Sequence, residues 1–321
     1  MSKVSVLVSV YKNENNIIPF YEDFMANIVP AFKDEGDDYE LIMINDDSPD
    51  NSWSIMKNLA IKDDHIKLLR LSRNFGAISA TFTGLSYATG DCITVKACDL
   101  QEPAELTVKM YKEWKNGEKG LFAVREARRD GFFSDMMSNV YYWVMRKMVD
   151  SSMPKGGFDI YMIDKDVKDQ IVQMNDKNSN IALQLMWLGF HPKKLYYVRK
   201  EREIGKSSWT FSKKLKLFLD SLIAFSYVPI RLMTMIGILF FLFAIIFGIK
   251  VIIAKIHGLI PIQGYTTLLV IVLFSAGTIM FTLGILGEYI WRILEASRNR
   301  PQFVVVDAIN FGDKSIGEGV K

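Results

Sequence analysis

The sequence predicts an α/β protein with a parallel sheet, followed by a basic amphipathic helix and a hairpin of two membrane-length apolar helices. Short apolar runs alternate with helical patterns over residues 1–210, and two long uncharged runs follow. Strands that alternate with helices along a chain form parallel sheets. An apolar run of about 20 residues is long enough to cross the hydrocarbon core of a membrane.

Residues 4–10 form a continuous run rich in β-branched residues, which predicts a strand that is buried on both faces. Further strands are expected at residues 39–44, 66–71, 92–97, 120–124 and 191–198. Helices are predicted between them, where apolar residues recur at helical spacing. They are expected at residues 13–29, 52–61, 76–89, 105–116, 135–149 and 180–188.

The composition changes beyond residue 210. Lys213, Lys214 and Lys216 precede a run of leucine, isoleucine and phenylalanine, which predicts a helix lying in the membrane interface. The segments 232–249 and 266–287 contain no charged residue and predict two spans. Positively charged residues are more frequent beside the outer ends of this hairpin than in its loop. Because such residues are enriched on the cytoplasmic side of membranes, both ends of the hairpin are expected in the cytoplasm. Two buried helices of a soluble domain are the alternative interpretation.

This organisation gives four expected regions. We expect a cytoplasmic α/β domain at residues 1–210, an amphipathic interfacial helix at 211–229, two transmembrane helices within 230–290 and a cytoplasmic C-terminal tail at 291–321. The net charge of +3 at pH 7 is too small to indicate a nucleic acid as partner. Cys92 and Cys98 lack the spacing and the partner histidines of a zinc site, so we expect free thiols.

Acidic residues cluster at the ends of the second and fourth predicted strands. Residues 46–50 are Asp-Asp-Ser-Pro-Asp, and residues 99–103 are Asp-Leu-Gln-Glu-Pro. In an open α/β sheet, ligands bind outside the carboxyl ends of the strands. A carboxylate there accepts hydrogen bonds from a ribose or base, and another holds a divalent cation against phosphate oxygens. Together the clusters predict a nucleotide-diphosphate site, although the first alone also fits ordinary turn chemistry.

With these motifs the chain resembles the family 2 glycosyltransferases, which have the GT-A fold. Within that family it is most similar to the branch that transfers a sugar from a nucleotide onto polyprenyl phosphate, which includes bactoprenol glucosyltransferases and dolichyl-phosphate mannose synthases. The matching segments span nearly the whole chain: residues 8–14, 45–50, 71–76, 99–103, 156–159, 205–209 and 287–289. The resemblance implies a Rossmann-like GT-A catalytic domain at residues 1–210.

The resemblance also implies roles for individual residues. Nucleotide contacts are expected from Ser9, Tyr11, Glu14, Asp46, Arg73 and Asp99. Mg²⁺ or Mn²⁺ is expected on Asp99 and Gln101. Catalytic roles are expected for Asp159, Asp99 and Arg125, with Asp159 near the acceptor phosphate. Because guanidinium and ammonium groups suit phosphate oxygens, the acceptor phosphate is expected at Arg128, Arg202, Lys206 and Ser207.

The chain departs from the family pattern at the metal motif. The family usually has Asp-x-Asp-x-Gln there, but Ala97 stands at the first aspartate position. The loss of a hard oxygen ligand weakens metal binding unless water, Glu102 or the donor's phosphates replace it. Mg²⁺ keeps several waters and relies on substrate phosphates, so we expect a working but altered site. Ser9, where the family often has proline, is expected to have a mild effect.

The implied reaction is the attack of a polyprenyl (undecaprenyl) phosphate oxygen on the anomeric carbon of a nucleotide-activated sugar, with inversion. A donor such as UDP-glucose or another UDP-hexose is favoured, and the product would serve the synthesis or modification of cell-surface glycans. Expected partners are the donor, the lipid phosphate, the inner (cytoplasmic) membrane and further copies of the chain in a tetramer. The chain is expected to be a multi-pass protein of that membrane.

Three alternatives remain open at this stage. A processive polysaccharide synthase of the same fold usually carries a Gln-x-x-Arg-Trp motif and more spans, neither of which is found in the sequence. A non-catalytic membrane scaffold would have kept the fold while Ala97 removed the activity. A membrane transporter is the third alternative, but two spans are few for a transporter unless several chains assemble.

Overall fold

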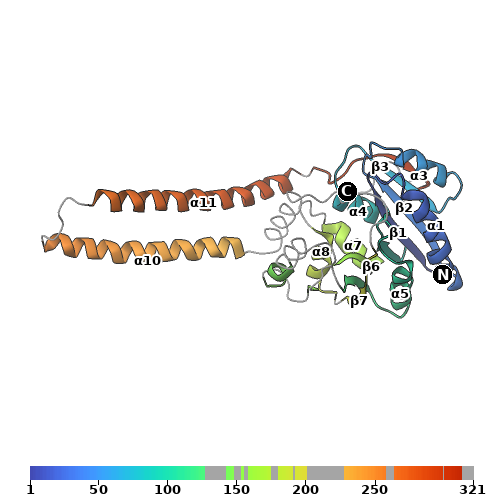
Figure 1. The fold of residues 1–321 in the computed structure, drawn as a ribbon, viewed down its shortest axis with the longest axis horizontal. Coiled ribbons are helices and arrows are strands. Elements are labelled where there is room, and N and C mark those ends of the chain that lie inside the picture. Colours follow the sequence, from blue (N-terminus) through green and yellow to red (C-terminus); the bar gives the residue numbers. More distant parts are fainter. Residues whose placement is uncertain are drawn as a thin grey trace. The chain divides into compact units, whose positions relative to one another are not determined.

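The computed structural model describes residues 1–126, 142–147, 153–154, 158–174, 180–190, 192–200, 228–257, 264–298 and 300–312. The chain divides into two compact units, one of Met1–Phe218 with Pro301–Lys321, and the other of Leu219–Arg300. The first unit contains an eight-stranded sheet, and the second contains two long helices (Figure 1).

Strands and helices alternate over most of the first unit, and the structure adds one helix and two strands, α7, β6 and β8, that were not predicted. The elements are β1 (Lys3–Val10), α1 (Ile17–Asp23), η1 (Phe24–Ile28), α2 (Val29–Asp34), β2 (Asp38–Asn45), α3 (Ser52–Ala60), β3 (Ile66–Leu71), α4 (Ala77–Tyr87), β4 (Cys92–Val95), α5 (Ala104–Lys115), β5 (Gly120–Arg125), β6 (Phe158–Asp164), α7 (Lys165–Met174), α8 (Ile181–Trp187), β7 (Lys193–Tyr197) and β8 (Val305–Ile309).

The predicted helix at residues 13–29 continues to Asp34 with a π-helical segment, η1, before Pro30. Proline lacks the N–H that would continue the regular bonding pattern. Most of the helix predicted at residues 135–149 lies outside the described residues.

The sheet is mixed, so the prediction of a parallel sheet is wrong for two of its strands, β6 and β8. Its strand order is β7-β5-β6-β4-β1-β2-β3-β8. The central strands β4, β1, β2 and β3 run parallel, whereas β6 is antiparallel to both β4 and β5, and β8 is antiparallel to β3. β6 and β8 were not predicted: Asp159 interrupts the apolar run of β6, and β8 pairs with a strand that lies far away along the chain.

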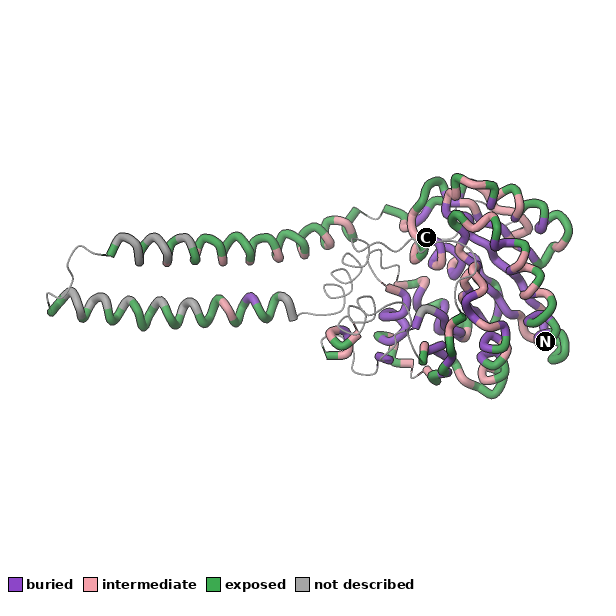
Figure 2. Tube along the Cα trace, in the orientation of Figure 1, coloured by how far each residue is buried: buried purple, intermediate pink, exposed green. Residues whose placement is uncertain are grey.

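Helices cover both faces of the central strands. Val6 and Val8 of β1 are fully buried in a core that includes Phe20 and Phe24. On the other face, α4 lies so close to the sheet that a Cβ atom at Gly84 would be 2.9 Å from the Cδ1 atom of Ile44. Burial on both faces explains why β1 and β2 are largely apolar runs. Figure 2 shows the strands of this unit mostly in the buried colour.

Strand β8 closes the sheet edge beside β3, where the chain returns from the second unit. Leu68 pairs with Ile309, and the Ser72 N–H donates to the Val304 carbonyl at 2.9 Å. The Asn310 amide donates to the carbonyl oxygens of Ala60 and Ile66 at 3.0 and 2.9 Å. The edge of β3 is therefore paired rather than exposed, and the loop that begins at Ser72 is attached to β8.

The side chain of Asn310 is expected to stabilise this edge measurably. Asn310→Ala should lower the free energy of unfolding by about 2 kcal/mol, because two carbonyl groups lose their donor. Asn310 has a φ of 65°, which asparagine tolerates better than alanine. Asn310→Gly is the matched control, since it removes the amide without that strain. Urea unfolding of both variants measures the effect, and a glycine variant as stable as the parent would contradict this role of the amide.

The second unit consists of α10 (Val228–Ile256) and α11 (Tyr265–Ser297). The segments predicted to be apolar helices, residues 232–249 and 266–287, lie within them. The two helices contact each other, with the Thr282 hydroxyl 4.0 Å from the sulfur of Met233. No helix among the described residues combines the length and the apolar character that a membrane crossing requires. The predicted interfacial helix at 211–229 lies outside the described residues except for its last two positions.

Candidate active site

The carboxyl ends of β1, β2, β3 and β4 meet at one edge of the sheet. Val10 pairs with Asn45, and Leu7 pairs with Val95. The N–H of Asp46 donates to the Val10 carbonyl at 3.0 Å, and the N–H of Lys96 donates to the Leu7 carbonyl at 2.9 Å. The two acidic clusters therefore begin at the same edge, on either side of β1.

The turn after β1 is bound to the turn after β2 by side chains of both. Glu14 Oε2 accepts from the Asn51 N–H at 3.0 Å, and Asp50 Oδ2 accepts from the Glu14 N–H at 3.2 Å. Ser48 Oγ accepts from the Lys12 N–H at 2.7 Å and donates to Asp50 Oδ1 at 2.6 Å. Burial acts to raise the pKa of Asp50, but these hydrogen bonds outweigh it and the pKa is lowered. These hydrogen bonds join the two turns into one wall of the site, and nucleotide contact by Glu14 stays a prediction.

Asp46 binds the loop that leads into α4. Its two carboxylate oxygens accept from the N–H groups of Phe75 and Gly76 at 2.7 and 2.9 Å. The residue is 3% exposed, and this burial raises the pKa of its carboxyl group. In the same loop the Arg73 guanidinium lies 4.3 Å from the ring centroid of Phe75. Asp46 therefore shapes the loop that carries Arg73, a function that sequence reasoning missed, and its expected contact with a nucleoside stays a prediction.

Removal of the Asp46 carboxylate is expected to destabilise the protein. Asp46→Ala should lower the free energy of unfolding by about 2–3 kcal/mol, because two backbone donors lose a charged acceptor in a buried place. Asp46→Asn should cost less, since one acceptor oxygen remains. Urea unfolding at neutral pH checks the order of the three proteins. An alanine variant as stable as the parent would show that the carboxylate does not hold this loop.

The loop after β4 is organised by a buried lysine and glutamate. Lys96, which is 2% exposed, donates to the Glu102 carbonyl at 3.0 Å, and Glu102 Oε2 accepts from the Ala97 N–H at 3.3 Å. Burial lowers the pKa of Lys96 and raises that of Glu102. Leu100 has a φ of 57°, which turns the chain back between Asp99 and Gln101. Glu102 points into the loop, so it is not available to replace the ligand lost at Ala97.

Asp99 and Gln101 lie together with an arginine that sequence reasoning missed. Nη2 of Arg199 donates to Gln101 Oε1 and lies 4.0 Å from Asp99 Oδ2. Gln101 is held further by its amide, which donates to the Lys200 carbonyl at 3.3 Å. Arg199 follows β7, and Tyr197 of that strand pairs with Arg125 at the end of β5. The sequence did contain a signal for Arg199, because this residue directly follows the predicted strand 191–198. Residues that follow parallel strands lie at the carboxyl edge of the sheet.

The donor atoms of Asp99 and Gln101 fit a divalent cation. A carboxylate and an amide carbonyl are the hard oxygen ligands that Mg²⁺ and Mn²⁺ prefer, and Mg²⁺ keeps several waters in such sites. No cluster of three or more histidine, cysteine or acidic residues that suits a metal occurs in the described part of the chain. Asp99 and Gln101 are the two protein ligands proposed among the residues that the structure describes, and water and phosphate oxygens suit the remaining positions.

The other predicted residues are distributed as follows. Ser9 Oγ lies 3.1 Å from Thr81 Oγ1, and Tyr11 is 36% exposed at the end of β1. Phe158 pairs with Val124 at the same edge, so the backbone of Asp159 in β6 lies close to it. The side chain of Asp159 is not described. The acceptor-phosphate residues lie outside the described residues: Arg128, Arg202, Lys206 and Ser207.

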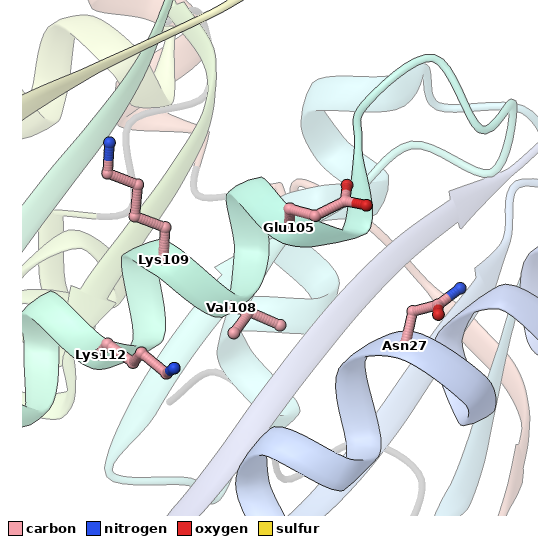
Figure 3. A pocket seen from close by; sticks show the side chains of 5 residues that line it. All are labelled: Asn27, Glu105, Val108, Lys109 and Lys112. Atoms are coloured by element: carbon pink, nitrogen blue, oxygen red, sulfur yellow. The ribbon is translucent and has the colours of Figure 1, made fainter.

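A pocket between η1 and α5 lies apart from these residues. It is lined by Asn27, Glu105, Val108, Lys109 and Lys112 (Figure 3). No residue predicted for the nucleotide, the metal or the acceptor lines it. The edge formed by β1 and β4, with its carboxylates and arginines, is therefore the better candidate site.

Comparison with known proteins identifies the family. Residues 5–172 match the family model described as glycosyl transferase family 2. This chain belongs to that family. The predicted resemblance to family 2 is therefore confirmed, and the chain is a glycosyltransferase.

Relatives of this family 2 glycosyltransferase align along almost its whole length. It is 32% identical over 313 residues to the uncharacterized glycosyltransferase YkcC of Bacillus subtilis (strain 168), covering 97% of this chain and 96% of that protein. It is 32% identical over 305 residues to the prophage bactoprenol glucosyl transferase homolog of Escherichia coli (strain K12), covering 94% and 98%. The solved mannosyltransferase PcManGT from Pyrobaculum calidifontis, in complex with GDP-Man and Mn²⁺, has a TM-score of 0.46 and 16% identity, covering 64% of this chain and 58% of that one.

Proposed function

We propose that this glycosyltransferase moves a sugar from a nucleotide-diphosphate sugar to polyprenyl phosphate. The observation that carries the proposal is the similarity to the prophage bactoprenol glucosyl transferase homolog, which extends over 94% of this chain and therefore includes parts of both units. UDP-glucose or another UDP-hexose is the proposed donor. The product is a lipid-linked sugar for the synthesis or modification of cell-surface glycans.

In this proposal the donor lies at the carboxyl edge of the sheet. Its nucleoside contacts the wall formed by the turns after β1 and β2 and the loop of Arg73. The nucleotide-binding residues are Ser9, Tyr11, Glu14, Asp46, Arg73 and Asp99. Asp99 and Gln101 hold Mg²⁺ or Mn²⁺, and this ion, when bound, stabilises negative charge on the leaving diphosphate.

The acceptor phosphate is already anionic at neutral pH, so the reaction needs little help from a general base. One of its oxygens forms the bond to the anomeric carbon as the bond to the diphosphate oxygen breaks, and the electron pair leaves with the nucleoside diphosphate. Such a displacement inverts the anomeric centre. The residues proposed to position the acceptor are Asp159, Arg125, Arg128, Arg202, Lys206 and Ser207. Positioning and electrostatic stabilisation then supply most of the rate.

The second unit is proposed to hold the chain in the inner membrane, with the catalytic unit in the cytoplasm. The segments 232–249 and 266–287 carry no charged residue. Large apolar side chains are exposed along both helices, including Leu239 at 63%, Phe281 at 59% and Ile293 at 68%. Figure 2 shows exposed residues along both helices. Apolar surface of this extent requires lipid or further protein to cover it. Membrane insertion and the tetramer expected from the resemblance are both proposals that fit this surface.

A donor screen tests the proposed reaction. Full-length protein is incubated with undecaprenyl phosphate, Mg²⁺ or Mn²⁺ and radiolabelled UDP-glucose, UDP-N-acetylglucosamine, UDP-galactose or GDP-mannose, and the lipid phase is extracted. We expect label in that phase with at least one donor, only when undecaprenyl phosphate is present. Labelled lipid that appears with none of these donors would contradict the proposal.

A further inference from the structure

Arg199 occupies the space between the two residues that are proposed to hold the metal. Its Nη2 donates to Gln101 Oε1 and lies 4.0 Å from Asp99 Oδ2. The side chain of Asp99 is only 8% exposed, and that of Arg199 is 24% exposed. The positive charge of the guanidinium is therefore held against both proposed ligands in a place that water reaches poorly.

Two further hydrogen bonds fix the orientation of Gln101. The Gln101 amide nitrogen donates to the Lys200 carbonyl at 3.3 Å, and the Gln101 carbonyl accepts from the Lys200 N–H at 3.0 Å. These two bonds direct Oε1 toward the guanidinium. A divalent cation bound to Oε1 would lie beside a fixed positive charge, and such charges repel strongly at low exposure. The cation and the present position of Arg199 therefore exclude each other.

Arg199 also has an unused donor. Its Nε atom is buried and has no hydrogen-bond partner among the residues that the structure describes. A buried donor without a partner is costly, so a group that binds there is favoured. Guanidinium groups bind phosphate oxygens through two parallel N–H groups, and Nε with one Nη is such a pair. A donor diphosphate beside Asp99 offers the matching oxygens.

We propose that the guanidinium of Arg199 and a divalent cation occupy this site in turn. In the donor-free enzyme Arg199 holds Gln101 and neutralises Asp99. When the divalent cation binds, Arg199 leaves Gln101 and turns its guanidinium to the diphosphate. This inference rests on the proposed function for its ligand, a nucleoside diphosphate. It gives Arg199 two opposite effects, because the side chain hinders the cation but assists the nucleotide.

Binding of Mn²⁺ alone tests the first effect. Full-length protein is titrated with Mn²⁺ without nucleotide, and free Mn²⁺ is measured by electron paramagnetic resonance. Arg199→Met and Arg199→Gln should both bind Mn²⁺ about tenfold more tightly than the parent, because a fixed positive charge is removed. Lys200→Met is the matched control. It removes the same charge from the adjacent, exposed side chain and should change the affinity much less.

Binding of UDP at saturating Mn²⁺, followed by calorimetry, tests the second effect. Both Arg199 variants should bind UDP about tenfold more weakly, which is one lost charge-assisted contact. A residue with a merely structural role would weaken both ligands together. Mn²⁺ affinity that is unchanged or weaker in both variants, with the circular dichroism of the parent, overturns the inference. The Mn²⁺ titration needs no turnover, so its outcome is separate from that of the donor screen.

Discussion

Replacement of Asp99 by alanine is expected to lower the rate of sugar transfer by about 10³-fold, the loss typical of a group that stabilises developing charge in the transition state. Asp99 is the only carboxylate proposed as a metal ligand, since Ala97 supplies none and Glu102 is bound to the Ala97 N–H. The rate constant at saturating donor and acceptor, measured from label in the lipid phase, checks this expectation.

Two further variants separate this role from a general loss of charge. Ala97→Asp restores the ligand position of the family and should leave the rate unchanged or raise it. Asp47→Ala is the matched control, because Asp47 lies at the same edge but is 41% exposed and faces Arg70 at 3.6 Å. It should keep most of the activity. If Asp99→Ala retains more than about a tenth of the parent rate, the proposed role of Asp99 fails.

Loss of Glu40 is expected to have the largest effect on stability. Its carboxylate is buried and accepts from Lys67 Nζ at 2.6 Å, Ser5 Oγ at 2.6 Å and the Thr89 N–H at 2.7 Å. Lys3 Nζ is a further partner at 3.1 Å. Removal of one partner from such a buried pair typically costs about 3–5 kcal/mol, because the remaining charge is left uncompensated. Urea unfolding of Glu40→Ala at neutral pH measures this loss.

The same carboxylate is expected to make stability depend on pH. Burial acts to raise the pKa of Glu40, but the hydrogen bonds from Lys67, Ser5 and Thr89 outweigh it and lower the pKa from 4.5 to about 2. A lowered pKa in the folded state gives stability that is complete above the unfolded pKa and is lost as the pH falls toward the folded one. The contribution of about 3 kcal/mol should therefore decline between roughly pH 4.5 and pH 2.

Comparison with Glu40→Gln isolates this contribution from that of other carboxylates. The difference in the free energy of unfolding between the parent and Glu40→Gln should be largest near neutral pH and should shrink below about pH 4.5. A difference that stays constant down to the acid limit of the experiment would show that Glu40 titrates alike in both states.

The central strands were predictable from the sequence because their local pattern reflects their surroundings. β1 and β2 are buried along most of their length, so they appear as largely apolar runs. β6 was missed because Asp159 interrupts its short apolar run, which lies beside β4 and β5 in antiparallel pairing. β8 was missed because its partner β3 precedes it by more than two hundred residues, as in the pair Leu68 and Ile309. Pairing at such a distance leaves no local signal.

The position of the candidate site was also predictable, but its contacts were not. Alternating strands and helices place residues 46–50 and 99–103 at one edge, and β1, β2 and β4 do run parallel there. The bonds from Phe75 and Gly76 to Asp46 depend on the path of a loop. The contact between Arg199 and Gln101 joins residues 98 positions apart. Loop geometry and long-range contacts decide what each carboxylate binds, and neither follows from spacing alone.

The central claim is that a nucleoside diphosphate and a divalent cation bind at the carboxyl ends of β1 and β4. A crystal structure of the full-length protein with UDP and Mg²⁺ tests it most directly. We expect the diphosphate beside Asp99, with the ion about 2.1 Å from oxygens of Asp99 and Gln101 and with Arg199 released from Gln101. A nucleotide bound elsewhere, with the Asp99 carboxylate directed away from it, would contradict the claim.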